Sequence, residues 1–187
     1  MNASVLTSAS AQKIQNDLRE IIREVPDFPK PGILFKDITP LLQDSDLCKR
    51  IIHLLCEWHQ PAKPDIIAGV ESRGFLFGFP MAIEMGIPFA LIRKAGKLPA
   101  KKISANYELE YGTAVVELHE DSIYPGMKVA IHDDLLATGG TSEAAARLVK
   151  MSNAEVCAFS FLLGLDFLNG EDLLHKHSEN VLILARF

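Results

Sequence analysis

Two adjacent carboxylates, Asp133 and Asp134, close an apolar run in the stretch VAIHDDLLATGGTSEAAARLV. An ionised carboxylate accepts two or more hydrogen bonds, so a neighbouring pair suits either a divalent cation or the two hydroxyls of a ribose. An isolated pair would more simply end a strand and cap a turn. The residues that follow the pair decide between these interpretations.

The next segment is a turn that consists of Ala137, Thr138, Gly139, Gly140 and Thr141. Its glycines let backbone N–H groups approach an anion, and its two threonine hydroxyls add hydrogen bonds. The following SEAAARLV favours a helix, so the anion would meet the positive helix N-terminus. A diol site beside a phosphate site predicts a ribose phosphate. No G-K-[ST] follows the glycines, which excludes a Walker loop, and G-x-G-x-x-G is absent too.

Helical and extended patterns alternate along the chain, which indicates an α/β fold with a parallel sheet covered by helices. Helical spacing spans Gln12–Arg23 and Asp46–Trp58 and returns after a turn within residues 71–86. Strands are expected at residues 66–70, 89–94, 128–133, 154–165 and 181–187. Ligands bind beyond the carboxyl ends of such strands, which is where this order puts the aspartate pair.

An antiparallel pattern interrupts this order between residues 96 and 120. There Tyr107, Leu109 and Tyr111 alternate with Glu108 and Glu110. We therefore expect an antiparallel lid over about residues 94–120.

Composition limits the class of protein. The chain has 187 residues, 48% of them hydrophobic, which predicts a single domain over residues 1–187. A net charge of −5 without a basic block argues against nucleic acid as a partner. No signal peptide or membrane-spanning run is found, so we expect a cytoplasmic protein with no membrane partner. Cys48, Cys56 and Cys157 lack C-x-x-C spacing and are expected to be buried apolar groups.

Five segments resemble a known family. IHDDLLATGGT resembles the phosphoribosyl pyrophosphate motif of the type I phosphoribosyltransferases. PDFPKPGILFKDITP, AGVESRGFLFG, LIRKAGKLP and YELEYG resemble segments of the adenine phosphoribosyltransferases, in that family's order and at its spacing. The similarity covers roughly residues 26–174. It implies the type I phosphoribosyltransferase fold, a central parallel sheet flanked by helices, with a flexible antiparallel lid and a small hood at about residues 24–40 that forms part of the base pocket.

The resemblance implies a magnesium-dependent purine salvage step, in which adenine and phosphoribosyl pyrophosphate give AMP and pyrophosphate, and it implies a homodimer. Residues 137–141 would hold the ribose phosphate, and Asp133 and Asp134 the ribose hydroxyls. Mg²⁺ would be carried by the substrate, and either aspartate would reach it directly or through water.

The resemblance also implies three basic ligands for the pyrophosphate. Arg73 would donate several charge-assisted hydrogen bonds, and the Glu71–Ser72 peptide beside it is a candidate for a cis bond. Arg93 and Lys97 resemble further pyrophosphate ligands, with Arg93 supplied across a dimer interface. As charges alone, Arg93 and Lys97 would more simply form a solvated face.

The base pocket implied by the resemblance is built on GILFKD. Phe35 would stack on the purine, and the backbone of Leu34 and Lys36 would read its polar edge. Leu165 would form the opposite wall. From its own sequence context, Phe35 is equally well a core aromatic residue.

Glu110 is implied as the principal acid/base residue, which shares the proton lost by the purine, and Tyr111 is implied as a substrate-binding residue. Strand alternation places Glu108 and Glu110 on one face, so periodicity does not choose between them. The resemblance does, because Glu110 matches the acidic residue before Tyr-Gly.

Three positions depart from the family's commoner pattern. Lys36 stands where arginine is frequent, Gly164 where an acidic residue is common, and His132 where an aliphatic residue is usual. The departure at Gly164 bears on closure of the base pocket, and His132 is expected to be a hydrogen-bonded strand histidine. His175 and His177 have no third ligand and are expected to be surface residues and not a metal site.

Two other functions share parts of this pattern. A regulator could keep the phosphoribosyl pyrophosphate site as a sensor that controls nucleic-acid binding. Such a regulator should carry a basic DNA-binding module and lack the catalytic lid, whereas this chain has no such module and contains YELEYG. Within the enzymes, transfer to hypoxanthine, guanine or xanthine stays open.

Overall fold

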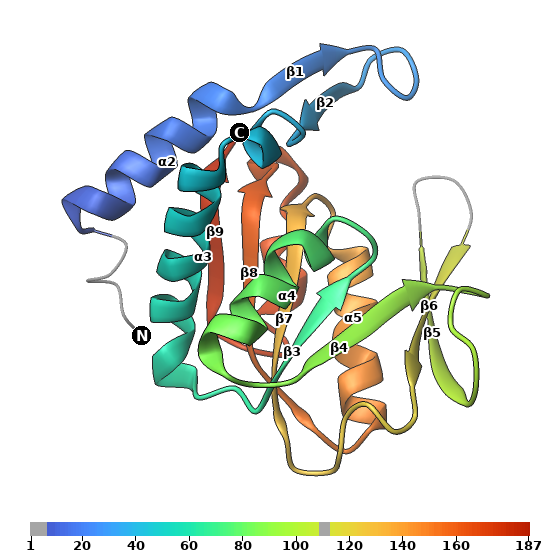
Figure 1. Ribbon diagram of the computed structural model, residues 1–187. Coiled ribbons are helices and arrows are strands. Elements are labelled where there is room, and N and C mark those ends of the chain that lie inside the picture. The colour runs from blue at the N-terminus through green and yellow to red at the C-terminus, as the bar shows by residue number, and fades with distance from the viewer. Residues whose placement is uncertain (1–6, 109–112) are drawn as a thin grey trace.

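The computed structural model describes residues 7–108 and 113–187, and its centre is a seven-stranded sheet in the order β5-β6-β4-β3-β7-β8-β9 (Figure 1). The strands are β3 (Ile66–Val70), β4 (Phe89–Lys94), β5 (Lys102–Glu108), β6 (Thr113–His119), β7 (Lys128–Leu136), β8 (Glu155–Gly164) and β9 (Val181–Arg186). The pairs β4–β3, β3–β7, β7–β8 and β8–β9 are parallel. The pairs β4–β6 and β5–β6 are antiparallel. The α/β class with a mostly parallel sheet is confirmed.

Helices cover both faces of this sheet. α2 (Ala9–Ile21), α3 (Ser45–His59) and α4 (Gly74–Met85) share one buried apolar cluster, whereas α5 (Gly140–Met151) and α6 (Glu171–Leu174) contribute to another on the opposite face (Figure 1). Short 3-10 turns lie at Leu41–Gln43, Gln60–Ala62 and Asp166–Leu168. None of the helices in the described ranges has the length and apolar character needed to cross a bilayer.

The N-terminal helix differs from its prediction at both ends. It begins at Ala9 because the Ser8 hydroxyl caps it, accepting from the Ala11 N–H at 3.2 Å. It ends before the predicted Arg23 because β1 (Arg23–Pro26) pairs antiparallel with β2 (Leu34–Asp37). This separate two-stranded hairpin lies on the side of the carboxyl ends of the central strands (Figure 1).

The antiparallel segment predicted as a lid is rooted in the central sheet. β5 and β6 pair from Lys102 opposite His119 to Glu108 opposite Thr113, and β6 also pairs with β4. The buried side chains on these strands include Ala105, Tyr107, Val116 and Leu118. Most of this hairpin therefore belongs to the core. Residues 109–112, with Glu110 and Tyr111, lie outside the described residues.

β7 is longer than its prediction. It pairs with β3 only as far as His132, but it pairs with β8 as far as Leu136, because β8 itself runs to Gly164. The prediction that the strand ends at Asp133 is therefore wrong. Asp133 and Asp134 lie within the strand, just beyond its pairing with β3. The order of strands reverses between β3 and β7, which is the point where open α/β sheets bind ligands.

The cysteines carry no disulfide bond. Cys56 is buried as predicted, whereas Cys48 and Cys157 are only half-buried, so that prediction is wrong for two of the three. Burial raises the pKa of Cys56 to about 12 and of Cys157 to about 11. Because the thiolate is the reactive form, these two thiols are inert at neutral pH.

Two histidines share one hydroxyl inside the core. His59 Nε2, at the end of α3, and His132 Nδ1, on β7, each lie 2.9 Å from Ser160 Oγ. One hydroxyl has one hydrogen, so Ser160 donates to one ring and accepts from the other. The expectation of a hydrogen-bonded strand histidine at 132 is confirmed. Burial lowers the pKa of both rings to about 3, so both are neutral at physiological pH.

This burial predicts a pH dependence of stability through His59. Its pKa is about 3 when folded and 6.5 as the ordinary value, so below pH 6.5 the unfolded chain binds a proton that the folded protein does not. The contribution is therefore full above pH 6.5 and is lost as the pH falls toward 3, by up to about 1.4 kcal/mol per pH unit. His59→Asn should flatten the slope of unfolding free energy between pH 6 and pH 5, measured by urea denaturation.

The control is His53→Asn, on the exposed face of α3. A hydrogen bond to Glu84 raises the pKa of His53, so its stabilisation is present at low pH and is lost as the pH rises. Its removal should leave the slope unchanged or steeper. A wild-type slope in His59→Asn would show that His59 protonates in the folded protein.

Candidate active site

The turn at residues 137–141 leads directly into α5. Gly139 has φ +82°, a left-handed conformation that glycine adopts without steric cost. The first helical hydrogen bond is donated by Glu143 N to Gly139 O at 2.9 Å, so the N–H groups of Gly140, Thr141 and Ser142 precede the helical ladder. These N–H groups lie at the helix N-terminus where the sequence predicts an anion site.

A second glycine lies against this turn. A β-carbon on Gly139 would lie 2.5 Å from Gly170 O, and a β-carbon on Gly170 would overlap Ala137 O. Two backbone segments from distant parts of the sequence therefore touch directly. The sequence analysis missed Gly170, since a glycine before a short helix gives no signal of what packs against it.

Arg73, at the start of α4, contacts Asp134 of the aspartate pair. Arg73 Nε lies 2.9 Å from Asp134 Oδ2 as an ion pair, but it is not aligned as a hydrogen bond, so this buried oxygen has no hydrogen-bond partner among the described atoms. The Asp134 N–H donates to Asp133 Oδ1 at 2.8 Å. Gly74 permits this approach, because a β-carbon there would lie 2.7 Å from His132 O.

Burial governs the ionisation of both aspartates. Burial raises the pKa of Asp133, and the neighbouring Asp134 carboxylate raises it further. Burial also raises the pKa of Asp134, and the Arg73 guanidinium opposes that shift. A cation or hydrogen-bond donor that enters this site would therefore stabilise the charged forms.

The predicted base pocket meets this site through Phe35. The Arg73 guanidinium lies 5.3 Å from the centre of the Phe35 ring, and Phe28 packs edge-on against the same ring at 5.1 Å. Leu34 is 47% exposed beside it. Lys36 is buried, with Nζ bound to Glu24 and 4.2 Å from the centre of the Phe187 ring. The Lys36 side chain is thus engaged with Glu24 and Phe187, and the reading of the purine by its backbone stays a prediction.

The other predicted pyrophosphate ligands, Arg93 and Lys97, lie at the end of β4 and just beyond it. Arg93 donates through Nε and Nη2 to Glu71 at 3.2 and 3.3 Å, and through Nη1 to the Lys97 carbonyl at 2.9 Å. Arg93 is therefore engaged with Glu71 and half-buried, whereas Lys97 is exposed, and the role of both as pyrophosphate ligands stays a prediction. The predicted cis Glu71–Ser72 peptide is confirmed.

Glu71 is a residue that the sequence analysis did not single out as a ligand partner. Burial alone would raise its pKa, but hydrogen bonds from Arg93 and from the Lys94 N–H outweigh that effect, so its pKa lies below the ordinary value. The signal was available, because β3 and β4 are successive parallel strands whose carboxyl ends meet at one edge.

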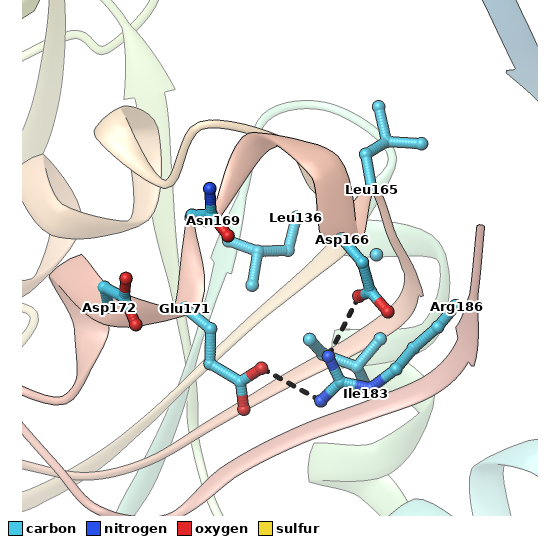
Figure 2. A pocket seen from close by; sticks show the side chains of 10 residues that line it. Leu136, Leu165, Asp166, Asn169, Glu171, Asp172, Ile183 and Arg186 are labelled. Carbon is cyan, nitrogen blue, oxygen red and sulfur yellow. Dashed lines mark hydrogen bonds and ion pairs between the residues drawn. The ribbon is translucent and has the colours of Figure 1, made fainter.

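Leu165 lines a cavity of about 230 Å³ at the carboxyl ends of β7, β8 and β9 (Figure 2). Gly164 also lines it, and a β-carbon at this glycine would lie 2.8 Å from Ile183 Cγ2. Ile183 therefore occupies the space that a larger residue at 164 would need. Across the cavity Arg186 binds Asp166 and Glu171, each at 2.9 Å.

A larger cavity of about 580 Å³ lies beside the turn at residues 137–141, which is called the phosphate turn below after its predicted ligand. Thr138 and Gly140 line one side of it, and Asn106 and Thr113 of the β5–β6 hairpin line another. Arg147 of α5 joins the two sides, since its Nη2 donates to the Asn106 carbonyl. The phosphate turn and the predicted lid therefore border one space.

The oxygen atoms of Asp133 and Asp134 fit a magnesium ion that the family implies, but they do not form a complete cage. No cluster of three or more candidate metal-ligating side chains occurs in residues 7–108 and 113–187. Mg²⁺ prefers oxygen ligands and keeps several waters or substrate phosphate oxygens. The orphaned, buried Asp134 Oδ2 matches a role through water or through one direct bond.

The histidines near the C-terminus lie close to carboxylates. His175 lies 3.8 Å from Glu171 and 3.7 Å from Glu179. The His177 side chain is only 6% exposed and lies 3.7 Å from Glu143, so its predicted surface position is wrong. The reason is that α6 packs against α5, a contact that sequence spacing does not reveal.

A doubly flanked parallel sheet with this turn and aspartate pair defines the class of the phosphoribosyltransferases: the family model "Phosphoribosyl transferase domain" matches residues 38–168. A relative from Cytophaga hutchinsonii, named adenine phosphoribosyltransferase, is 47% identical over 180 residues, 96% of this chain and 99% of that one. Another from Desulfitobacterium hafniense, with the same name, is 49% identical over 86% of this chain and 93% of its own.

Solved structures agree with this similarity. The crystal structure of adenine phosphoribosyltransferase from Thermoanaerobacter pseudethanolicus has a TM-score of 0.89 at 46% identity, covering 92% of this chain and 99% of that chain. The Saccharomyces cerevisiae enzyme, complexed with an imino-altritol bisphosphate and adenine, has a TM-score of 0.86 at 38% identity, with 92% and 99% covered. The chain belongs to the adenine phosphoribosyltransferase family.

The contact between Gly139 and Gly170 gives the first prediction for the site. Gly139→Ala should cost about 1 to 3 kcal/mol more folding stability than Gly126→Ala, because only the first introduces overlap with a neighbouring backbone. Gly126 is a matched control, since its φ is +83° and nothing lies within 4 Å of an added β-carbon. Urea denaturation measures both losses. Equal losses would mean that the turn shifts freely away from Gly170.

Proposed function

We propose that this protein transfers the phosphoribosyl group of phosphoribosyl pyrophosphate to adenine and releases AMP and pyrophosphate, a purine salvage reaction. The observation that carries the proposal is the position of Arg73, 2.9 Å from Asp134 and 5.3 Å from the Phe35 ring centre. It brings the proposed pyrophosphate, ribose and base subsites together. Relatives named adenine phosphoribosyltransferase, at 47% and 49% identity, support the same reaction.

The proposed sugar-phosphate subsite uses backbone and carboxylates for different groups. The N–H groups at the start of α5 and the Thr138 and Thr141 hydroxyls bind the phosphate of the ribose. Asp133 and Asp134 accept hydrogen bonds from the two ribose hydroxyls. Mg²⁺, when bound with the substrate, neutralises pyrophosphate charge and helps it leave.

The proposed leaving-group subsite depends on Arg73. As the bond from the anomeric carbon to pyrophosphate breaks, negative charge grows on the pyrophosphate oxygens. The guanidinium has five N–H donors in a fixed plane, and only its Nε lies against Asp134, so other donors are left for these oxygens. Lys97 adds positive charge at the end of β4. The supply of Arg93 across a dimer interface stays a prediction, since within this chain Arg93 binds Glu71.

The proposed base subsite lies between Phe35 and Leu165. Stacking on an aromatic ring holds a flat base by its face, without selecting among purines. Selection comes from the backbone of Leu34 and Lys36, whose carbonyl groups accept from the exocyclic amine of adenine. Hypoxanthine carries a carbonyl in place of this amine, so two hydrogen-bond acceptors, its carbonyl and a backbone carbonyl, would face each other without a donor.

Self-association is supported by an apolar stripe on α4. Leu76, Phe79 and Ile83 are 44%, 53% and 65% exposed, and their helical spacing puts them on one face. Exposed apolar residues that gather in this way favour a protein–protein contact, and a twofold homodimer is the simplest symmetric solution. Sedimentation velocity, which gives the mass in solution, tests this homodimer. The cytoplasmic location and the absence of nucleic-acid and membrane partners stay predictions.

The proposal predicts strong selection of adenine. Catalytic efficiency with phosphoribosyl pyrophosphate should be at least about a hundredfold higher for adenine than for hypoxanthine, guanine or xanthine, because each buried unpaired polar group costs about 1 to 3 kcal/mol. Steady-state assays with the four bases, following nucleotide by chromatography, measure this ratio. Nucleotide formed equally from hypoxanthine would contradict adenine specificity, and no nucleotide from any base would overturn the transfer itself.

A second prediction concerns the acid/base group. Glu110→Gln should lower kcat by roughly 10²- to 10⁴-fold while base binding is largely kept, because an amide cannot take the proton that the purine loses. Glu108→Gln is the matched control, two residues away, and should change kcat little. Small, equal effects of both substitutions at saturating substrates would leave Glu110 as an ordinary charged residue.

A further inference from the structure

The last strand carries an arginine that binds two carboxylates. Arg186 lies opposite Gly164 in the register of β8 and β9. Its Nη1 donates to Asp166 Oδ1 and its Nη2 to Glu171 Oε2, both at 2.9 Å (Figure 2).

These two carboxylates stand at the two ends of one short segment. Asp166 follows Leu165, which is the proposed wall of the base pocket. Glu171 follows Gly170, which touches the phosphate turn. The Asp166 N–H also donates to the Phe187 carbonyl at 3.0 Å, so the start of the segment is tied to the end of β9 by backbone as well.

The contact at Gly170 transmits the position of this segment to the turn. An added β-carbon at Gly170 would overlap Ala137 O, and one at Gly139 would lie 2.5 Å from Gly170 O. Backbone packed on backbone has no flexible side chain that could absorb a displacement. A shift of Glu171 therefore moves Gly170, and with it the N–H groups that bind the phosphate.

We propose that Arg186 is a positioning residue that, by holding Asp166 and Glu171 together, fixes the segment from Leu165 to Glu171 against the phosphate turn. The inference rests on the proposed function, because it assigns Arg186 to the affinity for phosphoribosyl pyrophosphate. A guanidinium suits this task, since its planar fork presents two nitrogens to two carboxylates, whereas an ammonium is a single point charge.

The test compares Arg186→Met with Arg50→Met. Arg50 of α3 is a matched control, because it also binds two carboxylates: Asp17 of α2 at 2.9 Å and Asp46 of α3 at 3.0 Å. Its side chain is 34% exposed, and that of Arg186 is 42% exposed. Partly exposed ion pairs add little to global stability, so both variants should unfold at similar temperatures. Only Arg186→Met should raise KM for phosphoribosyl pyrophosphate, by about three- to tenfold, with kcat within about twofold.

Two further variants separate positioning from general weakening. Arg186→Lys should restore part of the lost affinity, because it keeps the charge but not the double contact. Glu171→Gln should reproduce the KM increase, and it should add little in the Arg186→Met background, since both substitutions break the same contact. Calorimetric titration of ribose 5-phosphate reports on the phosphate turn without turnover and should weaken by a similar factor.

The outcomes distinguish this inference from the proposed function. If the wild-type protein forms no AMP, the proposed function fails, and the titration with ribose 5-phosphate still decides whether Arg186 positions the turn. If the wild-type protein is active and Arg186→Met keeps the KM of Arg50→Met, the inference is overturned. A loss of kcat without a change in KM would also overturn it, because the effect would then lie in the chemical step.

Discussion

A guanidinium 2.9 Å from a buried carboxylate joins the start of α4 to the part of β7 just beyond its pairing with β3, and the rest of the candidate site is arranged around that ion pair. Arg73 follows β3 and Asp134 lies on β7, so the pair bridges the two strands between which the sheet order reverses. Close approach depends on Gly74, where any side chain would overlap the backbone of β7. Without Arg73, Asp134 would be a buried carboxylate without a counter-charge, and its protonated, neutral form would have the lower free energy.

The site is built mostly from backbone that has no freedom to adjust. The backbone of the phosphate turn packs against Gly170. Gly170 lies in the segment between Asp166 and Glu171, and Arg186 donates a hydrogen bond to each of these two carboxylates. Anion recognition by N–H groups needs donors fixed before the ligand arrives, because ordering a flexible turn would reduce the affinity. The mainly parallel sheet supplies the rigid frame, and the β5–β6 hairpin is part of that frame as far as Glu108.

The sequence allowed prediction of those features that depend on near neighbours. Helical spacing, the buried strands and the turn before α5 are local patterns, and each was located to within a few residues. The sequence did not reveal contacts between residues far apart in the chain, such as Gly139 with Gly170 or Arg186 with Asp166. The end of β7 was missed for the same reason, because the length of β8 determines it. Arg73 and Phe35 became neighbours only through the fold, since neither spacing nor composition relates them.

Several buried side chains among the described residues have a polar atom without a hydrogen-bond partner, and two settings differ in their consequence: the His59–His132 pair in the core and Asp134 at the sheet edge. His59 and His132 share Ser160 deep in the core, and their remaining ring nitrogens face no partner among the described atoms. Both rings are neutral, so each unpaired nitrogen costs only the free energy of desolvating a neutral polar group. No ligand reaches the core, so this cost is the same whether or not a substrate is bound. Asp134 Oδ2 is different, because it belongs to an acid beside a second acid and an arginine at the sheet edge. Its cost falls when a hydroxyl donor or a cation arrives, so the free energy of desolvating this carboxylate is recovered on binding. An unsatisfied carboxylate at the strand reversal therefore favours ligand binding, whereas an unsatisfied imidazole in the core only reduces stability.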